Sequence, residues 1–298
     1  MVLPDAGETG ALQGNVPGAG FPWISRFGRD GIRQRGSAVA CGRIAAGMLI
    51  LPELERIHEV YLSLSRVALE HFGRGLGGKL LFRSALDADG IAAIVAGSVA
   101  GAASLCADDE AARVSGALRN GLCDFVVSNL NEALRILKNE LRRSRPVSVC
   151  LKADPRRCIE ELVERGLQPD LISVGQSGGQ NGALMLKERG AVPLLETDPA
   201  PAGTSLLVWS VAAEPARRLL RISRLAGEAL DPSRSDTAAR RRWLEAAPRQ
   251  LGRSFGNRQC LRMAEAEIPG FLQRLHSEAL PVSVLRDGEA IPIPRARG

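Results

Sequence analysis

A short loop with alternating acidic residues is the part of this sequence that bears most directly on chemistry. Asp87 and Asp89 stand two residues apart, and Gly90 follows them at the start of a long run of small apolar residues. In a dinucleotide-binding fold this loop is rich in glycine, so that its backbone and the next helix N-terminus approach a pyrophosphate. Like charges about 4 Å apart repel by about 4 kcal/mol near a protein surface. We therefore expect the two aspartates to repel a phosphate ligand.

A second acidic run follows the next predicted strand. Asp108, Asp109 and Glu110 come about 20 residues after the loop, where a dinucleotide-binding fold carries the carboxylate that holds the ribose hydroxyls. Acidic side chains are also common in the first turn of a helix, and a helix is predicted from about Ala111. The sequence leaves both interpretations open. Gly90 and Asp108 are therefore candidate cofactor-binding residues.

Ser177 is the third candidate for cofactor binding, because it lies among glycines in the stretch 175–179. This stretch lacks the full spacing of a nucleophile elbow, and the chain has only 3 histidines that could act as a base. We expect a turn or a helix start there, with free backbone N–H groups that suit an anion. The sequence identifies no catalytic residue.

No metal site is predicted. The run from Asp87 to Gly90 resembles part of a calcium loop, but Ala85 and Ala96 stand where the first and last acidic ligands belong. The histidines are not at zinc-ligand spacing, and the 6 cysteines include no Cys-x-x-Cys pair. Several cysteines lie in apolar runs, so we expect buried, reduced thiols.

Strands and helices alternate between Gly78 and Val174. The run 91–103 is small and apolar on nearly every face, which suits a helix pressed tightly against a sheet. Near-continuous apolar strands such as 147–151 are typical of buried parallel sheets. The pattern predicts an α/β fold with a doubly wound parallel sheet. Strands are predicted at 79–82, 105–107, 123–127, 147–151, 171–174, 190–195 and 205–212, and helices from Pro52, over 91–103, from about Ala111, after an Asn129 cap and from Pro155.

The chain divides into three predicted parts. Residues 1–40 are rich in Gly, Pro, Asp and Arg without periodicity, so we expect a flexible arm. Residues 41–200 hold the doubly wound sheet. Residues 201–298 begin with a strand, continue as an arginine-rich, mostly helical extension, and end in short strand-like pieces after Leu280. The arginines of the extension are Arg217, Arg221, Arg224, Arg240, Arg241, Arg242, Arg249, Arg253, Arg258 and Arg262.

Composition and charge set limits on partners. The net charge is +6 and the pI is about 9.3, which permits weak attraction to polyanions without demanding it. Aromatic residues make up only 4% of the chain, with Trp243 and Phe255 the ones near the C-terminal arginines. No apolar run approaches the roughly 20 residues of a membrane span, and no secretory leader is evident. We expect a cytoplasmic protein without a membrane partner.

The order and spacing of features from Tyr61 to Asp170 resemble the NAD-binding, Rossmann-like central domain of urocanase (urocanate hydratase). Urocanases use bound NAD⁺ as an electrophile: the substrate adds to the nicotinamide ring, and water adds to the adduct. The resemblance implies a Rossmann-like fold, NAD as cofactor, a carbon–oxygen lyase of histidine metabolism and a homodimer. The matching pieces are Tyr61, His71–Gly73, Gly78–Leu80, Asp108, Arg113, Leu130–Leu134, Pro146–Val149, Glu161–Gly166 and Pro169–Asp170.

Several functional positions depart from the family pattern. The family's Gly-Gly-Met-Gly-Gly-Ala-Gln loop is Asp-Ala-Asp-Gly-Ile-Ala-Ala here, over 87–93, so the two aspartates argue against NAD. The later family segment that corresponds to 174–180 keeps only Ser177. Urocanases also surround this domain with a large scaffold that supplies catalytic groups, and the residues from Thr204 onward do not resemble that scaffold.

Three functions follow as hypotheses. The leading one is a urocanase-like Rossmann-domain protein that is non-catalytic or repurposed for another ligand or partner. The first alternative is an NAD-dependent urocanate hydratase-type lyase, in which Asp87 and Asp89 point away from the pyrophosphate and Asp108 holds ribose. The second is a binder of an acidic partner or nucleic acid through the C-terminal arginines, although scarce aromatics argue against nucleic acid. The expected partners are a small-molecule nucleotide or an unidentified protein.

Overall fold

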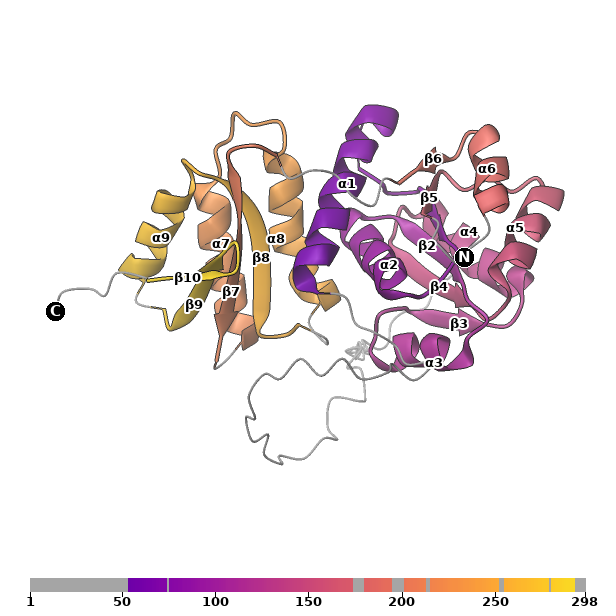
Figure 1. Cartoon of the computed structure of the whole chain (residues 1–298), viewed down its shortest axis with the longest axis horizontal. Coiled ribbons are helices and arrows are strands. Elements are labelled where there is room, and N and C mark those ends of the chain that lie inside the picture. Colours follow the sequence, from indigo (N-terminus) through magenta and orange to yellow (C-terminus); the bar gives the residue numbers. More distant parts are fainter. Residues whose placement is uncertain are drawn as a thin grey trace, which may run out of the picture. The chain divides into compact units, whose positions relative to one another are not determined.

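The computed structural model describes residues 53–73, 75–173, 180–194, 201–212, 215–251, 255–278 and 280–292 (Figure 1). These residues fall within one compact unit, Ile44–Gly298. The predicted arm over 1–40 lies outside the described residues, as do Ser177 and Arg253. The predicted domain boundaries therefore stay predictions.

A six-stranded sheet is built from the first part of the described chain, in the order β3-β4-β2-β1-β5-β6. Every pairing is parallel; for example, Leu81 lies opposite Ser104 on one side and Leu171 on the other. Strands β2 and β4 are buried at every position, as expected for strands covered on both faces. The strands are β1 (Leu80–Arg83), β2 (Ala103–Ala107), β3 (Phe125–Val127), β4 (Val147–Leu151), β5 (Leu171–Ser173) and β6 (Val192–Pro193).

Helices cover both faces of this sheet, and a hydrophobic core lies under each layer. Leu81 and Cys106 belong to the core under α1, α2 and α3, whereas Phe82 and Leu105 belong to the core under α4, α5 and α6. Successive strand residues point to opposite faces, which explains the division. The predicted α/β, doubly wound parallel fold is confirmed. The helices are α1 (Leu54–Phe72), α2 (Ala88–Ala100), α3 (Ala111–Arg119), α4 (Leu130–Arg142), α5 (Pro155–Glu164) and α6 (Gln180–Glu188).

Cap residues explain where the helices begin. The Asn129 side chain accepts a hydrogen bond of 2.9 Å from the Glu132 N–H, and Asp154 accepts one of 2.9 Å from the Arg156 N–H. Both helices start as predicted. Helix α2 begins three residues before the predicted Ile91, because Asp87 caps it. The sequence pattern located the apolar part of that helix but not its polar first turn.

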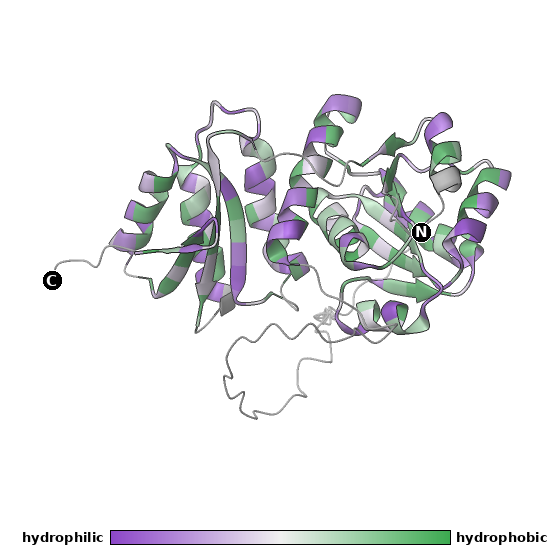
Figure 2. Ribbon diagram, in the orientation of Figure 1, coloured by the Kyte–Doolittle hydropathy of each residue, from purple (hydrophilic) through white to green (hydrophobic). Residues whose placement is uncertain are grey.

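Helix α2 is buried on every side. All residues from Gly90 to Ala100 are buried, since α2 lies against the sheet, against α1 and against α8 (Thr237–Leu251). Figure 2 shows the hydrophobic colouring of α2 and of the strands beside it. A Cβ added at Gly97 would lie 3.0 Å from the Ser104 Oγ and 3.1 Å from the Leu81 Cδ2. Glycine therefore allows this helix to approach the sheet closely.

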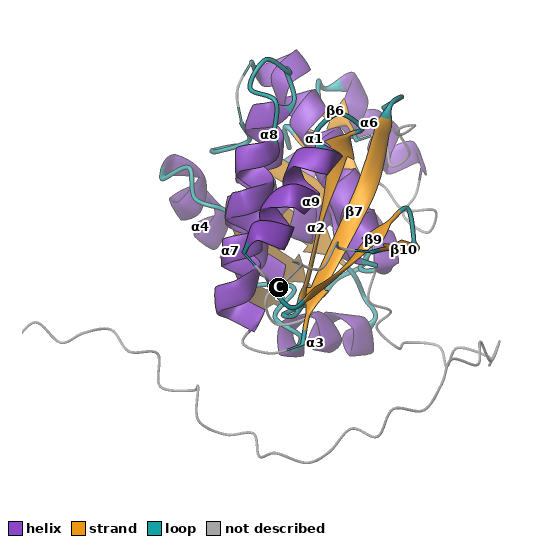
Figure 3. Cartoon of the chain, turned by 90° about the vertical axis from the view of Figure 1, so that its left-hand side faces the viewer, coloured by secondary structure: helices purple, strands orange, loops and turns teal. Residues whose placement is uncertain are grey.

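The C-terminal part contains a separate antiparallel sheet, in the order β10-β9-β7-β8. Helices α7, α8 and α9 lie on one side of it (Figure 3). The sequence predicts arginine-rich helical character through Arg262, but α8 ends at Leu251, and Arg258 and Arg262 lie on a strand. The bounds are β7 (Thr204–Val211), α7 (Pro215–Ala229), β8 (Arg258–Ala264), α9 (Ile268–Ser277), β9 (Val282–Arg286) and β10 (Glu289–Ile291).

Pairing with β7 explains why this segment forms a strand. Gln259, Leu261 and Met263 are buried and lie opposite Trp209, Leu207 and Ser205 of β7. Cys260 is buried as well, whereas Arg258 and Arg262 are only partly buried. Side chains on both faces of this strand are therefore covered, although the segment contains two arginines.

The four-stranded sheet and helices α7, α8 and α9 together form an antiparallel module. This module packs on α1 and α2 through α8. The Tyr61 hydroxyl donates to the Ala239 carbonyl oxygen at 2.7 Å, and the Arg242 guanidinium donates to the Ala100 carbonyl oxygen at 3.2 Å. The buried Trp243 ring lies 4.8 Å from the His58 ring and 5.0 Å from the Tyr61 ring, measured between centroids. Burial raises the pKa of Tyr61 to about 12. Helix α2 therefore packs against α8 as well as against the sheet and α1.

Candidate functional site

The loop after β1 ends in a carboxylate placed at the N-terminus of α2. Asp87 Oδ1 accepts a hydrogen bond of 2.7 Å from the Gly90 N–H and another of 2.7 Å from Arg83 Nη2. The N-terminus of a helix at this position is where dinucleotide-binding folds hold a pyrophosphate. Here a side chain of the protein itself supplies the negative charge.

Arg83 is the counter-charge to this carboxylate. It is the last residue of β1, it is completely buried, and its Nη1 donates to Ser173 Oγ at 2.8 Å. Its Nε donates to the Ala85 carbonyl oxygen at 3.3 Å. Ser173 ends β5, which lies beside β1 on the side opposite β2. The chain reverses its winding direction between these two strands, and doubly wound folds bind ligands outside the carboxyl ends of such strands.

Gly90 is fixed by close packing of the same loop. A Cβ at this position would lie 1.9 Å from the Ala85 carbonyl oxygen and 3.0 Å from Arg83 Nε. Real Cβ atoms do not approach a backbone oxygen this closely, so any larger residue would displace the loop. The glycine has a structural reason in this chain, and its predicted contact with a cofactor stays a prediction.

Asp89 faces a different neighbour. Its Oδ1 accepts a hydrogen bond of 2.8 Å from Arg56 Nε, which belongs to α1. The two aspartates of the loop therefore serve different partners: Asp87 joins the loop to β1, whereas Asp89 joins α2 to α1. Each of the two carboxylates has an arginine beside it, so part of their charge is offset within the protein.

Asp108 accepts four hydrogen bonds from the protein. The Leu86 N–H donates to it at 2.8 Å and the Glu110 N–H at 2.7 Å. The Arg113 guanidinium adds two more, both of 2.9 Å, and this contact raises the pKa of Arg113. Asp108 is only 1% exposed. The bond from the Glu110 N–H places Asp108 just before the first residue of α3, which agrees with its interpretation as an acid at a helix start. Ribose binding by Asp108 stays a prediction.

A hollow of about 260 Å³ opens beside these groups. It lies where β1, β2 and β4 end, and Asp154, the cap of α5, lies on its rim. Three helices therefore begin around this edge of the sheet. Asp87 and Asp154 cap α2 and α5, whereas Asp108 accepts from the N–H of Glu110, the residue before α3. The hollow is lined by Ser84, Ala85, Asp108, Asp109, Arg113, Asp154, Pro155 and Arg156.

Three buried cysteines lie close to this edge of the sheet. Cys106 and Cys150 are opposite each other on β2 and β4, and Cys123 lies close to both. Burial raises the pKa of Cys106, and a hydrogen bond with Cys123 together with burial raises that of Cys150. The thiols of Cys106 and Cys150 are therefore poor nucleophiles. All five cysteines in the described part of the chain are buried and unpaired, as predicted, and the same part holds no cluster of metal-ligating side chains.

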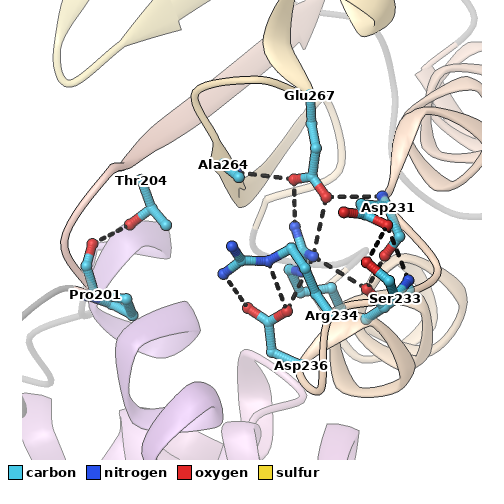
Figure 4. A network of polar contacts seen from close by, with 10 residues as sticks. Pro201, Thr204, Asp231, Ser233, Arg234, Asp236, Ala264 and Glu267 are labelled. Carbon is cyan, nitrogen blue, oxygen red and sulfur yellow. Dashed lines mark hydrogen bonds and ion pairs between the residues drawn. The ribbon is translucent and has the colours of Figure 1, made fainter.

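The arginines of the C-terminal module are largely engaged within the protein. Arg240 is buried and pairs with Glu267 through contacts of 2.5 and 3.1 Å. Glu267 also accepts bonds of 2.8 Å from the N–H groups of Asp231 and Ala264 (Figure 4). Burial opposes ionisation of Glu267, but these hydrogen bonds outweigh it and lower its pKa. Further pairs are Arg221–Glu278, Arg224–Glu228, Arg258–Glu55 and Arg286–Glu265.

The comparison with known families agrees with this geometry. Residues 57–178 match the family model of the urocanase Rossmann-like domain. This part of the chain is a urocanase-family, Rossmann-like domain, a class associated with NAD, and the predicted resemblance over Tyr61 to Asp170 is confirmed. The match covers the parallel sheet from α1 through β5 and leaves out the antiparallel module. Among the described residues, no helix combines the length and apolar character that a membrane crossing needs.

Proposed function

We propose that this urocanase-type Rossmann-like domain is non-catalytic and repurposed, and that it works through another ligand or a partner. The observation that carries the proposal is the position of Asp87. Its carboxylate sits on the α2 N-terminus and is held there by a buried arginine. A pyrophosphate that entered this position would first have to displace the carboxylate, or else meet it at a repulsive distance.

The position expected to hold the ribose of NAD does not fit this ligand either. Asp108, at the position expected to hold ribose, already accepts four hydrogen bonds. A ribose hydroxyl would have to replace the paired Arg113 or a backbone N–H group, and leaving such buried groups unpaired costs about 1–3 kcal/mol each. Both anchor points of a dinucleotide are thus occupied by bonds within the protein.

The chemistry of the hollow also supports a non-catalytic role. Among the described residues that line it, there is no histidine, lysine or cysteine. General acid–base catalysis near neutral pH relies most often on histidine, or on a carboxylate whose pKa is raised by burial. The one buried carboxylate among the described lining residues, Asp108, is already bonded to Arg113. The residues present are suited to holding the sheet edge together.

Calorimetric titration of NAD⁺ into the full chain tests the proposal. We expect no saturable binding by the native protein at micromolar concentrations. An Asp87→Gly/Asp89→Gly variant removes both charges, and an Asp87→Asn variant removes one charge while its amide oxygen can still cap α2. The matched control is Glu160→Ala/Glu164→Ala, which removes two exposed acids from α5. Micromolar binding of NAD⁺ by the native chain would overturn the proposal.

An NAD-dependent urocanate hydratase-type lyase is the second candidate. It is favoured by the place of the 260 Å³ hollow, at the carboxyl ends of the central strands, where nucleotides bind in related folds. When bound, NAD⁺ would supply an electrophilic ring to the substrate. Loss of urocanate absorbance with NAD⁺ present separates the two candidates, and we expect none. A cytoplasmic location and a homodimer stay predictions.

A further inference from the structure

A basic hollow lies on the helical layer that covers the other face of the parallel sheet, away from the loop after β1. It has a volume of about 420 Å³ and is formed where α4 passes the end of α5. Its lining consists of Asn131, Leu134, Arg135, Lys138, Arg165 and Leu167.

The rim of this hollow carries unbalanced positive charge. Arg135 and Lys138 are exposed, and neither forms an ion pair or a side-chain hydrogen bond with any residue in the described ranges. Arg142 follows on the same face of α4, seven residues after Arg135. Arg165 is the fixed member, because it donates to Asn131 Oδ1 at 2.6 Å and pairs with Glu161. Positive charge on this rim is therefore offset by one contacting carboxylate.

The floor of the hollow is apolar. Leu134 and Leu167 are half-buried and pack on the hydrophobic core beneath α4 and α5. An apolar floor inside a charged rim is the arrangement of a protein–protein contact, with a buried centre and a polar periphery. A ligand that matches it needs an apolar side chain between carboxylates.

We propose that this hollow binds an acidic, leucine-bearing peptide segment of another protein. Charge complementarity selects the occupant. A second copy of this chain would bring its own net charge of +6, which opposes self-association through a basic surface. A single-stranded nucleic acid would find no base stacking here and would leave the apolar floor uncovered, because the described residues of the lining include no aromatic side chain. This surface is distinct from the C-terminal arginines that suggested an acidic partner from sequence, and the proposal does not depend on whether NAD binds.

Fluorescence anisotropy tests the proposal with a labelled helical peptide that carries leucine flanked by glutamates on the same face. The full chain should bind it, and added salt should weaken the binding. Arg135→Glu/Lys138→Glu should weaken it about tenfold or more. Leu134→Ala, which removes part of the floor and leaves all charges, should weaken it about fivefold.

The matched control makes the same change in net charge on another helix of the protein. Arg241→Glu/Arg249→Glu alters two exposed arginines of α8 and should leave the affinity within about twofold. Thermal unfolding of each variant checks that it folds. The proposal is overturned if the glutamate peptide does not bind, if both charge variants weaken binding equally, or if a single-stranded oligonucleotide binds at Arg135 and Lys138 while the peptide does not.

Discussion

Arg83 in the parallel sheet and Arg240 in the antiparallel module are both almost fully buried, and each pairs with a carboxylate that also bonds backbone N–H groups. Their partners differ in exposure. The Glu267 side chain is 4% exposed beside Arg240 at 2%, whereas the Asp87 side chain is 45% exposed beside Arg83 at 1%. Solvent reaches one carboxylate and not the other.

This difference shows which ion pair is purely structural. Glu267 ties α8 to the turn before α9 and to the end of β8, and no outside group reaches it. Asp87 lies at an open edge of the sheet, so its carboxylate holds a position that an external anion could take. The half-exposed Asp87 carboxylate is thus open to solvent, in contrast to the closed pair of Arg240 and Glu267.

Replacing Arg240 or Arg83 should cause the largest losses in the free energy of unfolding. Arg240→Met leaves Glu267 charged and buried, so we expect a loss of about 3–5 kcal/mol in the free energy of unfolding. Arg83→Met leaves Asp87 partly hydrated, so a smaller loss of about 1–3 kcal/mol is expected. Urea unfolding of the two variants measures both. Equal losses would contradict the distinction between the closed and the open pair.

Gly90→Ala tests the rigidity of the loop after β1. The added Cβ meets the Ala85 carbonyl oxygen, and the resulting shift should cost about 1–3 kcal/mol. Gly270 in α9 is the control, because a Cβ there would contact nothing within 4 Å. Gly270→Ala should be neutral or stabilising by up to about 1 kcal/mol, as alanine favours helices. Similar unfolding midpoints for the two variants would show that the loop yields easily.

His58 reports on the junction between the two regions. It is completely buried, and neither ring nitrogen bonds to a described residue. Burial together with Arg262 and Arg240 lowers its pKa to about 3. The unfolded chain binds this proton below about pH 6.5, so stability should fall as the pH drops from 6.5 towards 3. The expected slope is about 1.4 kcal/mol per pH unit.

His58→Phe should remove that slope while keeping an aromatic ring against Trp243. Urea unfolding at several pH values between neutral and mildly acidic measures it. The control is His71→Phe, at an exposed position near the end of α1. An unchanged slope in His58→Phe would mean that other groups cause the loss of stability in acid.

The smallest expected effect concerns two helix caps. Asp154→Ala removes one cap at α5 and should cost about 1 kcal/mol. Asp87→Ala removes the cap of α2 and also the partner of Arg83, so we expect about 2 kcal/mol. Thermal unfolding compares them. Equal losses of stability in the two variants would mean that the ion pair between Arg83 and Asp87 adds nothing to the free energy of unfolding.

Local signals in the sequence were sufficient for much of the parallel sheet. The apolar run 147–151 is β4 with the predicted bounds, and Asp154 and Pro155 start α5 as expected. These features depend on burial of short runs and on caps within a few residues. The strand β8 was not predicted, because Arg258 and Arg262 give its sequence no clear apolar alternation; Arg258 pairs with Glu55, far away in the chain.

The candidate site was only partly foreseeable. The aspartates of the loop and their conflict with a phosphate were evident from residue type. Nothing in the sequence indicated that Arg83, four residues earlier, would be buried and bonded to both Asp87 and Ser173. That arrangement depends on the pairing of β1 with β5, which lies far along the chain. The only related feature of the sequence is the place of Arg83 directly after the apolar run 80–82, four residues before Asp87.

By itself, the sequence determined the alternation of strands and helices, the urocanase-like order of features and the acidic character of the edge loop, because these depend on neighbouring residues. Only the tertiary structure decided what the charged residues do. It pairs Asp87 with Arg83, gives Asp108 four bonds and engages Arg240 in the interior. The free energy of a charge depends on burial and on partners brought together by folding, and neither is written in the local sequence.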